Sequence, residues 1–411
     1  MTVSQPDPRS PVVIVGAGQA GLSTAAKLRD LGHEGPITLI GSEAQPPYQR
    51  PPLSKAYLMG SVTKDRLHLR PESFYAEKRI DLLLSTAVEH IDRAAMKVDL
   101  ADGHSIPYYR LVLATGARPR TLPAELGGRL EGVYHLRDIA HIDAMAGEFR
   151  PERHLVVIGG GYVGLEAAAV ARKLGLRVTL IEAAPRILQR VAAAETSDFF
   201  RELHRHHGVD LREGIGLERL SGSNGRVEAV HLTDGTRVPA DFVLVGIGVH
   251  PNAECAAAAG LEVQNGIIVD THLHTSDPNI LAAGDCALFP WRGVRFRLES
   301  VGNAIAQGEA AAASIMGVST GFEPKPWFWS DQFDVKLQIA GLSAGYDHVL
   351  TRTGPGRARS VWYYRDGELL AVDAIDDPRV FMVAKRLVEA GRTPPPDRVT
   401  DPDTDPRSLL A

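Results

Sequence analysis

Two stretches of the chain repeat one pattern of apolar and polar positions. The first begins with the apolar run Val12–Val15, which is typical of a strand buried on both faces, and the second begins with the similar run HLVVI. In each, a glycine turn is followed by an Ala-rich helical segment and a second apolar strand; in the first stretch these are expected near Gln19–Leu31 and Ile37–Ile40. The turn glycines match at an offset of 143 residues, Gly16, Gly18 and Gly21 with Gly159, Gly161 and Gly164. The pattern therefore predicts a duplicated βαβ module.

Each glycine turn lies where a dinucleotide-binding fingerprint requires it, after a buried strand and before a helix. The first glycine permits the tight turn, the second lets a pyrophosphate approach the backbone, and the third lets helix and strand pack closely. The helix N-terminus adds free N–H groups and the positive end of its dipole. Either two nucleotides bind together or one site is vestigial. Because both copies keep all three glycines, we expect two occupied sites.

The two copies differ at the end of the second strand. In the second copy this strand ends at Glu182, where a carboxylate accepts both ribose hydroxyls of an adenosine and repels the extra phosphate of NADP. This favours NADH, although Arg186 and Arg190 nearby leave NADPH open. In the first copy the aligned residue is a glycine, and the nearest polar candidates are Ser42 and Glu43.

The composition limits the classes of function. The 411 residues suffice for two or three domains, and 44% hydrophobic with 23% charged residues is an ordinary soluble composition. A net charge of -5 gives no global basic footprint for nucleic acid. Without an apolar stretch of about 18 residues or a signal-peptide pattern, we expect no membrane span. The composition thus predicts a cytoplasmic protein without nucleic-acid or membrane partners.

Four further segments carry a resemblance to a known family. They are ATGARPR at residues 114–120, NILAAGD at 279–285, RPPLSK at 50–55 and PWFWSDQ at 326–332. With the two glycine motifs, residues 11–391 resemble the oxygenase-coupled, NADH-dependent ferredoxin reductases of the FAD/NAD-linked reductase superfamily, the putidaredoxin and rubredoxin reductases. This resemblance implies an α/β fold with two Rossmann-like dinucleotide-binding domains, as in glutathione reductase, and a small α+β C-terminal domain. The implied limits are residues 1–118 and 247–325 for the discontinuous FAD-binding domain, 119–246 for the NAD-binding domain, and 326–411 for a C-terminal domain whose Pro- and Asp-rich tail is expected to be disordered.

The resemblance also assigns residues to the two cofactors. For FAD it implies Gly16, Gly18, Ala20, Gly21, Ser42, Glu43, Arg50, Lys55, Val88, Ala114, Arg137, Asp285 and Val301. For NADH it implies Gly159, Gly161, Gly164, Glu166, Glu182, Arg190, Gly246, Glu299 and Ser300. Lys55, Glu166 and Trp329 are the implied catalytic residues. A lysine beside the flavin stabilises negative charge on the reduced ring, and a paired carboxylate limits the cost of burying that lysine.

The cysteines argue against thiol chemistry. The chain has only Cys255 and Cys286, which form no CxxC pair, and we expect both to be buried and inert. Electrons should then leave directly from the flavin. Hydride would pass from NADH to FAD, and single electrons to a small two-iron two-sulfur ferredoxin, or a rubredoxin, of an oxygenase system. A basic patch would steer such an acidic partner, and its candidates are Lys336, Lys385, Arg386 and Arg392.

Two other functions stay open at this point. One is an NADH-dependent reductase of a small-molecule acceptor, of the monodehydroascorbate or quinone type. The other is a redox-gated binding protein similar to apoptosis-inducing factor. The HRHH run at residues 204–207 reads as a solvated helix rather than a metal site, because no second ligand set has a typical spacing.

Overall fold

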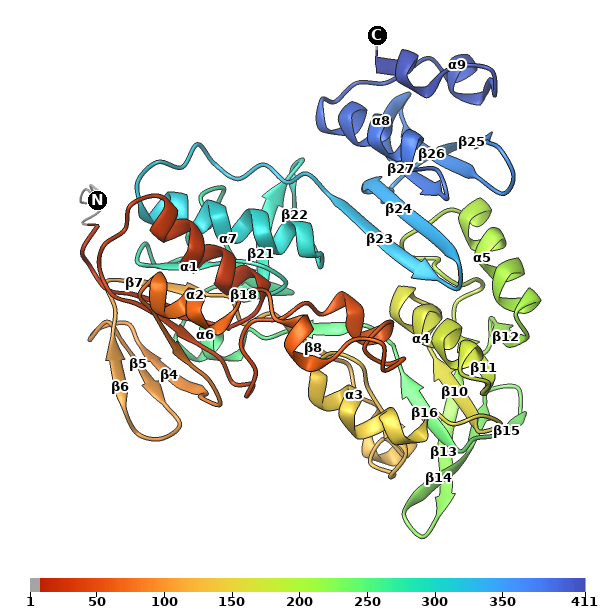
Figure 1. Cartoon of the computed structure of the whole chain (residues 1–411), viewed down its shortest axis with the longest axis horizontal. Helices are drawn as coiled ribbons and strands as arrows, with labels where there is room; N and C mark the ends of the chain where they lie inside the picture. Colours follow the sequence, from red (N-terminus) through yellow and green to blue (C-terminus); the bar gives the residue numbers. More distant parts are fainter. Residues whose placement is uncertain (1–7, 411) are drawn as a thin grey trace. The chain divides into compact units, whose positions relative to one another are not determined.

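The computed structural model of the protein describes residues 8–410 and divides the chain into two compact units (Figure 1). Unit 1 comprises Met1–Gln49, Lys64–Arg118 and Val249–Pro326. Unit 2 comprises Arg50–Thr63, Pro119–Gly248 and Trp327–Ala411. Unit 2 therefore joins the segments that the sequence assigns to the NAD-binding and C-terminal domains, and it also includes the RPPLSK segment.

Unit 1 is built on a five-stranded parallel sheet in the order β20-β7-β1-β2-β3. Strand β1 lies at its centre with all four residues buried, as its unbroken apolar run predicts. Helix α1 follows β1 after the first glycine turn and packs along α7 (Figure 1). The bounds are β1 Val12–Val15, α1 Gln19–Asp30, β2 Ile37–Ile40, β3 Ile80–Leu83, β7 Arg110–Leu113, β20 Ile280–Ala282 and α7 Val301–Ile315.

Smaller elements complete unit 1. An antiparallel sheet contains β4 (Val88–Asp92), β5 (Lys97–Leu100) and β6 (Ser105–Pro107). A second sheet contains β18 (Val263–Gln264), β19 (Gly266–Ile268), β21 (Ala287–Trp291) and β22 (Val294–Phe296). The paired strands β8 (Ala117–Pro119) and β17 (Val249–Pro251) carry the chain out of unit 1 and back into it. The short helices are α2 (Glu72–Glu77), α6 (Glu254–Ala258) and the 3-10 turn η2 (Lys64–Leu67).

Unit 2 repeats the architecture with a five-stranded parallel sheet in the order β12-β11-β10-β16-β9. Its bounds are β9 Val133–Tyr134, β10 His154–Ile158, α4 Tyr162–Lys173, β11 Arg177–Glu182, α5 Ala194–His206, β12 Val209–Glu213 and β16 Phe242–Val245. A small antiparallel sheet of β13 (Leu217–Ser223), β14 (Arg226–Leu232) and β15 (Arg237–Pro239) packs an apolar face on the same core. Also in this unit are α3 (Ile139–Met145) and the 3-10 turns η1 (Pro51–Ser54), η3 (Ala124–Leu126) and η4 (Ala146–Glu148).

The C-terminal part of unit 2 is an antiparallel sheet in the order β23-β24-β27-β26-β25, with α8 packed on β24 and β27. The bounds are β23 Trp327–Gln332, β24 Val335–Gly341, β25 His348–Thr353, β26 Arg359–Arg365, β27 Glu368–Ile375 and α8 Pro378–Glu389. The two parallel sheets and this α+β segment confirm the predicted fold class.

The expected disorder of the Pro- and Asp-rich tail is wrong for its described residues. They form α9 (Pro396–Thr400) and the turn η5 (Pro406–Leu410), and Val399 and Leu409 are buried in the core beneath α8. The Arg352 guanidinium holds this segment by donating hydrogen bonds to the backbone oxygens of Val399, Asp401, Pro402 and Thr404, at 2.6 to 3.1 Å. Composition misleads here because two apolar anchors and one arginine suffice to order a polar segment.

A wholly buried carboxyl group connects α5 to the C-terminal sheet. The Thr196 hydroxyl donates to Asp373 Oδ2 at 2.7 Å, and the Tyr363 hydroxyl donates to the same oxygen. Within the described residues, Asp373 Oδ1 has no hydrogen-bond partner. Burial raises the pKa of Asp373 from 3.8 to about 6, because the ionised form loses its hydration.

This shift predicts a specific dependence of stability on pH. Because the folded pKa lies above the unfolded value, the protonated carboxyl group favours folding below about pH 4, and this contribution is lost as the pH rises through about 6. Asp373→Asn removes the titration. Between pH 5 and pH 8, the wild-type free energy of unfolding should fall relative to that of the variant by about 1 to 2 kcal/mol. Urea unfolding at the two pH values measures this, with Asp366→Asn as an exposed control; parallel curves for wild type and Asp373→Asn would refute the expectation.

Candidate dinucleotide sites and a buried ion pair

The first glycine turn has the close contacts that its fingerprint predicts. A Cβ atom at Gly16, where φ is +117°, would lie 2.1 Å from the Ala114 carbonyl oxygen, and one at Gly21 would lie 2.0 Å from the Gly16 carbonyl oxygen. At Gly18 the space is open, with no atom within 4 Å of such a Cβ. Gly18 is also the N-cap residue of α1, and no described side chain caps that helix. The turn therefore presents bare backbone N–H groups to an approaching anion.

The NILAAGD segment at residues 279–285, which resembles a second flavin-binding signature of the family, lies beside this turn. A Cβ at Gly284 would lie 3.0 Å from Ala20 Cβ, so Ala20 and the signature that ends at Asp285 are neighbours in unit 1. The Gln307 side chain from α7 accepts a hydrogen bond from the Gly284 N–H at 2.8 Å, while its buried Nε2 has no partner among the described residues. A buried donor without a partner costs free energy, and a polar group of bound FAD would satisfy it. The chain's own residues therefore fit this cofactor.

The remaining predicted FAD residues of unit 1 come from three elements. Ser42 and Glu43 follow β2, where a Cβ at Gly41 would lie only 2.6 Å from Ala17 Cβ. This contact explains why the first copy has a glycine where the second has an acid. Val88 begins β4, and Val301 begins α7. The two residues before this helix belong to the predicted NADH set. The Ser300 hydroxyl caps α7 by accepting from the Asn303 N–H at 3.2 Å. Glu299 forms an ion pair with Arg297.

The second glycine turn reproduces the first. A Cβ at Gly159, where φ is +111°, would lie 2.4 Å from the Gly246 carbonyl oxygen, and one at Gly164 would lie 2.2 Å from the Gly159 carbonyl oxygen. Gly161 is open and is the N-cap residue of α4, a helix that no described side chain caps. The structure thus brings the predicted residue Gly246 against this turn.

The strand end beside the second turn carries its carboxylate in a fixed position. Glu182 accepts hydrogen bonds from the N–H groups of Gly160 and Ala184, each at 2.7 Å. Arg186 donates to the Ser197 hydroxyl at 2.6 Å. Arg190 is exposed and lies near Gly248, within 3.9 Å of where a Cβ would stand. The acid therefore adjoins the nucleotide turn, and one of the two nearby arginines has a partner within the protein.

An ion pair lies between η1 and α4 in unit 2. Lys55 Nζ is 2.6 Å from Glu166 Oε2, and the two side chains are 17% and 5% exposed. The Ser54 hydroxyl donates to the same carboxylate oxygen at 2.6 Å, and the Ser330 hydroxyl donates to Oε1 at 2.8 Å. The predicted pairing of Lys55 with Glu166 is thus present, whereas no sequence motif assigns a role to the two serines.

Three other predicted residues also belong to unit 2. The Arg50 guanidinium donates to the Arg137 carbonyl oxygen at 2.9 Å, so these two lie together. Trp329 is half-buried and stacks on Trp327, with ring centroids 5.5 Å apart and planes at 20°. Their contacts with FAD stay predictions.

The cysteines are only partly as expected. Cys286 is fully buried, but Cys255 is half-buried rather than buried. Neither forms a disulfide. Burial raises the pKa of both thiols, which lowers the thiolate fraction and with it their reactivity.

The solvated-helix interpretation of the HRHH run is wrong for its first residue. His204 is fully buried, its Nε2 lies 2.8 Å from Gln332 Oε1, and its ring meets Phe333 edge-on. The His207 ring stacks on the same phenylalanine, with ring centroids 3.8 Å apart. His206 is exposed. Helix periodicity allows one histidine to face inward while its neighbours face solvent.

Acidic side chains lie close to two of the candidate basic residues for partner binding, Lys336 and Lys385. Lys336 Nζ lies 3.7 Å from Asp331 Oδ1, and the backbone N–H of Lys336 donates to Asp376 Oδ1. On α8, Lys385 approaches Glu389 at 3.8 Å and the Trp327 ring at 5.1 Å, while Arg386 is exposed. Arg392 donates to the Leu410 carbonyl oxygen.

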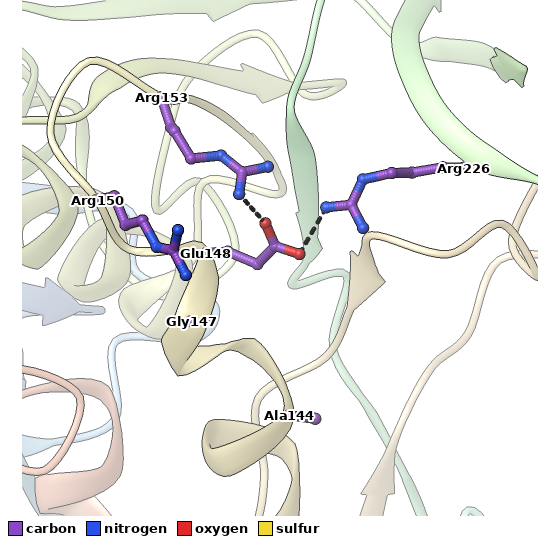
Figure 2. Close-up of a pocket in the computed structure, with 6 residues that line it drawn as sticks. All are labelled: Ala144, Gly147, Glu148, Arg150, Arg153 and Arg226. Atoms are coloured by element: carbon purple, nitrogen blue, oxygen red, sulfur yellow. Dashed lines mark hydrogen bonds and ion pairs between the residues drawn. The ribbon is translucent and has the colours of Figure 1, made fainter.

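A hollow of about 410 Å³ in unit 2 gathers three arginines, but its charges are largely paired (Figure 2). Arg153 and Arg226 both pair with the buried Glu148 carboxylate, and Arg226 also reaches Glu131 at 2.7 Å. The Tyr134 hydroxyl donates to the same carboxylate at 2.8 Å. We assign this cluster a structural role in joining η4 to β14. Within residues 8–410, no three side chains of His, Cys, Asp or Glu gather as metal ligands, and no helix has the length and apolar character to cross a membrane.

Sequence reasoning missed several polar residues that the structure places at these sites. Asn303 and Gln307 are four residues apart, and therefore on one face, in an otherwise Ala-rich helix. Ser330 and Gln332 alternate with Trp329 along β23 and are both fully buried. In each case the signal was a polar residue at a position where the helix or strand period predicts an apolar one.

Comparisons with known proteins show the family to which the chain belongs. A family model described as pyridine nucleotide-disulphide oxidoreductase matches residues 10–308, and one described as reductase C-terminal matches residues 327–410. Rhodocoxin reductase of Rhodococcus erythropolis is 43% identical over 403 residues, covering 97% of this chain and 94% of that protein. Putidaredoxin reductase CamA of Pseudomonas putida is 43% identical over 412 residues, covering 97% and 96%. The reductase in a crystal structure of the covalent putidaredoxin reductase-putidaredoxin complex is 42% identical with a TM-score of 0.94, covering 98% of each chain.

These matches confirm the predicted cofactors, FAD and NADH, and the predicted enzyme class. The chain therefore belongs to the pyridine nucleotide-disulphide oxidoreductase family and, within it, to the NADH-dependent ferredoxin reductases.

Proposed function

We propose that this reductase passes electrons from NADH, through FAD, to a two-iron two-sulfur ferredoxin that serves an oxygenase. The observation that carries the proposal is the buried Lys55–Glu166 pair, in a chain whose two thiols are unpaired. Relatives named after rhodocoxin and putidaredoxin support an acceptor that is itself a small redox protein. Bound FAD allows a donor that gives two electrons at once to reduce an acceptor that takes one electron at a time.

We assign the chain's residues to distinct tasks in this reaction. The first glycine turn, with Ala20 and Asp285, would bind the FAD dinucleotide, and the α7 N-terminus at Val301 would direct its positive end to the cofactor. The second turn, with Glu182, would bind NADH. The Lys55 ammonium group would stabilise negative charge on the reduced cofactor, and Glu166 would offset the cost of burying that ammonium group. The roles of Ser42, Val88, Arg137, Arg190, Glu299 and Trp329 stay proposals on the resemblance alone.

The role of Glu182 predicts a selective loss of NADH affinity. Glu182→Ala removes the acceptor for the ribose hydroxyls, and the Kd for NADH should rise on the order of 10-fold, which corresponds to about 1.4 kcal/mol. The preference for NADH over NADPH should narrow, because the repulsion of the extra phosphate is lost. The Kd is measured by adding NADH to the protein and following the absorbance of the protein. The control is Glu195→Ala, at an exposed position. An unchanged Kd for NADH would exclude the ribose contact.

The acceptor is tested by stopped-flow absorbance on the FAD-loaded protein. NADH should bleach the flavin rapidly, and two-iron ferredoxins should then support reduction of cytochrome c as a terminal reporter. A rubredoxin, monodehydroascorbate and a quinone are compared at equal concentration. Faster turnover with a ferredoxin than with any of these supports the proposal; faster turnover with a small molecule overturns it.

A cytoplasmic location belongs to the same proposal. The two unpaired cysteines suit a reducing compartment. Cell fractionation, with a known cytoplasmic marker, tests it.

A further inference from the structure

A line of buried hydrogen bonds leads from the Lys55–Glu166 pair to a histidine on another helix. Strand β23 places Ser330 and Gln332 on one face, and both are fully buried. Gln332 Nε2 lies 3.1 Å from Ser330 Oγ, and Gln332 Oε1 lies 2.8 Å from His204 Nε2. With the 2.8 Å bond from Ser330 to Glu166, the contacts form one unbranched chain from α5 through β23 to α4.

Elementary chemistry fixes the direction of every bond in this chain. A carboxylate oxygen accepts only, so the Ser330 hydroxyl hydrogen points to Glu166, and the Ser330 oxygen must accept from its other neighbour. That neighbour is therefore the NH₂ group of Gln332, and the Gln332 carbonyl oxygen faces His204. His204 must then carry its hydrogen on Nε2. All donors point toward Glu166.

The surroundings of His204 hold it to this single role. Its Nδ1 has no hydrogen-bond partner in the described part of the chain, and its ring meets Phe333 at a centroid distance of 5.0 Å. Burial lowers the pKa of His204 to about 4, so the imidazole is neutral at physiological pH. A neutral histidine that donates to an amide orients hydrogen bonds. It does not conduct protons along this series, because the amide accepts a hydrogen bond at its oxygen and donates one from a different atom, its nitrogen.

We propose that His204, Gln332 and Ser330 are positioning residues for the Glu166 carboxylate. His204 locks the Gln332 amide, the amide locks the Ser330 hydroxyl, and that hydroxyl holds Oε1 while Oε2 stays with Lys55 and Ser54. Without the His204 donor, the amide is free to turn its oxygen toward Ser330. The serine would then donate to Gln332 instead of Glu166. Loss of the His204 donor would thus remove a hydrogen bond from Glu166, which His204 does not contact through this series but reaches by way of Gln332 and Ser330. This inference rests on the proposed role of Lys55 and Glu166 in reducing the flavin.

A double-mutant cycle tests the proposal. Ser330→Ala and His204→Leu should each slow flavin reduction by NADH on the order of 10-fold, as expected for loss of one hydrogen bond to a charged group. The double variant should be no slower than Ser330→Ala alone, because the histidine acts only through the serine. His204→Gln, which places a donor near the Nε2 position, should restore the rate to within about 2-fold. The control is His206→Leu, exposed on the same helix.

A second readout does not depend on turnover. In the protein labelled with ¹⁵N-histidine, with or without FAD, His204 should show the neutral Nε2–H form throughout pH 5 to 8. The Nδ1–H form, or titration in this range, would overturn the proposal. The proposal would also be overturned if the two substitutions lowered the rate of flavin reduction multiplicatively in the double variant. A His204→Leu variant that is less stable, yet reduces its flavin at the wild-type rate, would overturn it as well. The double-mutant cycle measures only the reduction of the flavin by NADH, so failure of ferredoxin as an acceptor would leave the positioning proposal intact. If NADH did not bleach the flavin of the wild-type protein, the proposed function itself would be refuted.

Discussion

Glu166→Leu should destabilise the protein by about 3 kcal/mol, near the lower end of the cost of breaking a buried ion pair. The variant leaves the Lys55 ammonium group, on a side chain that is 17% exposed in the wild type, with two partners among the described residues, the Pro51 carbonyl at 3.2 Å and the Ser54 hydroxyl at 3.5 Å. Partial exposure reduces the cost, because solvent screens the unpaired charge. Urea unfolding of the FAD-loaded chain measures the change.

A second substitution separates stability from catalysis. Lys55→Met with Glu166→Leu replaces the pair by apolar side chains and should recover part of the lost stability, although the Ser54 and Ser330 hydroxyls still lack their acceptor. Flavin reduction by NADH should stay slow in the double variant, on the order of 100-fold below wild type, because no cation remains to stabilise the reduced flavin. Recovery of both stability and rate would show that the pair has only a structural role.

Gly16→Ala should yield a protein without FAD. The added methyl group would overlap the Ala114 carbonyl oxygen at 2.1 Å, and φ of +117° is strained for alanine. Strain and overpacking each cost about 1 to 3 kcal/mol, so a combined loss of several kcal/mol is expected. The ratio of flavin to protein absorbance after purification, with urea unfolding, measures both effects.

The neighbouring glycine provides a matched control. Gly18→Ala has open space for its methyl group, so the fold should persist while FAD affinity falls, because the methyl group occupies the approach of the pyrophosphate. In the second turn, Gly159→Ala should impair NADH binding and destabilise unit 2. Equal flavin content in Gly16→Ala and wild type would contradict the assignment of the first turn to FAD.

The sequence predicts the glycine turns well because each requirement is local. A buried strand, three glycines and a helix occupy a short segment, and the backbone geometry follows from residues that are neighbours in the chain. The same holds for Glu182, which ends the strand beside its turn. The prediction of the α/β fold with two dinucleotide-binding modules is confirmed for the same reason.

The parts that sequence reasoning missed depend on distant contacts. His204 is separated from Gln332 by 128 residues, and Ser330 from Glu166 by 164 residues. A hydrophobic pattern can mark a polar residue on an otherwise apolar face, but it does not identify the distant residue that this side chain contacts. The composition of the tail predicts disorder for a similar reason, since Arg352, which orders the tail, lies 47 to 52 residues before the residues that it contacts.

Residues 396–410 are held by Arg352 and by the buried side chains of Val399 and Leu409, and this has a practical consequence for engineering. Investigators who wish to tether a redox partner to this reductase would choose a polar, proline-rich end as a disposable linker. Here that choice would remove Val399 and Leu409 from the core beneath α8 and leave the Arg352 guanidinium without its backbone acceptors. A fusion should therefore keep every residue through Leu410 and add its spacer beyond that point.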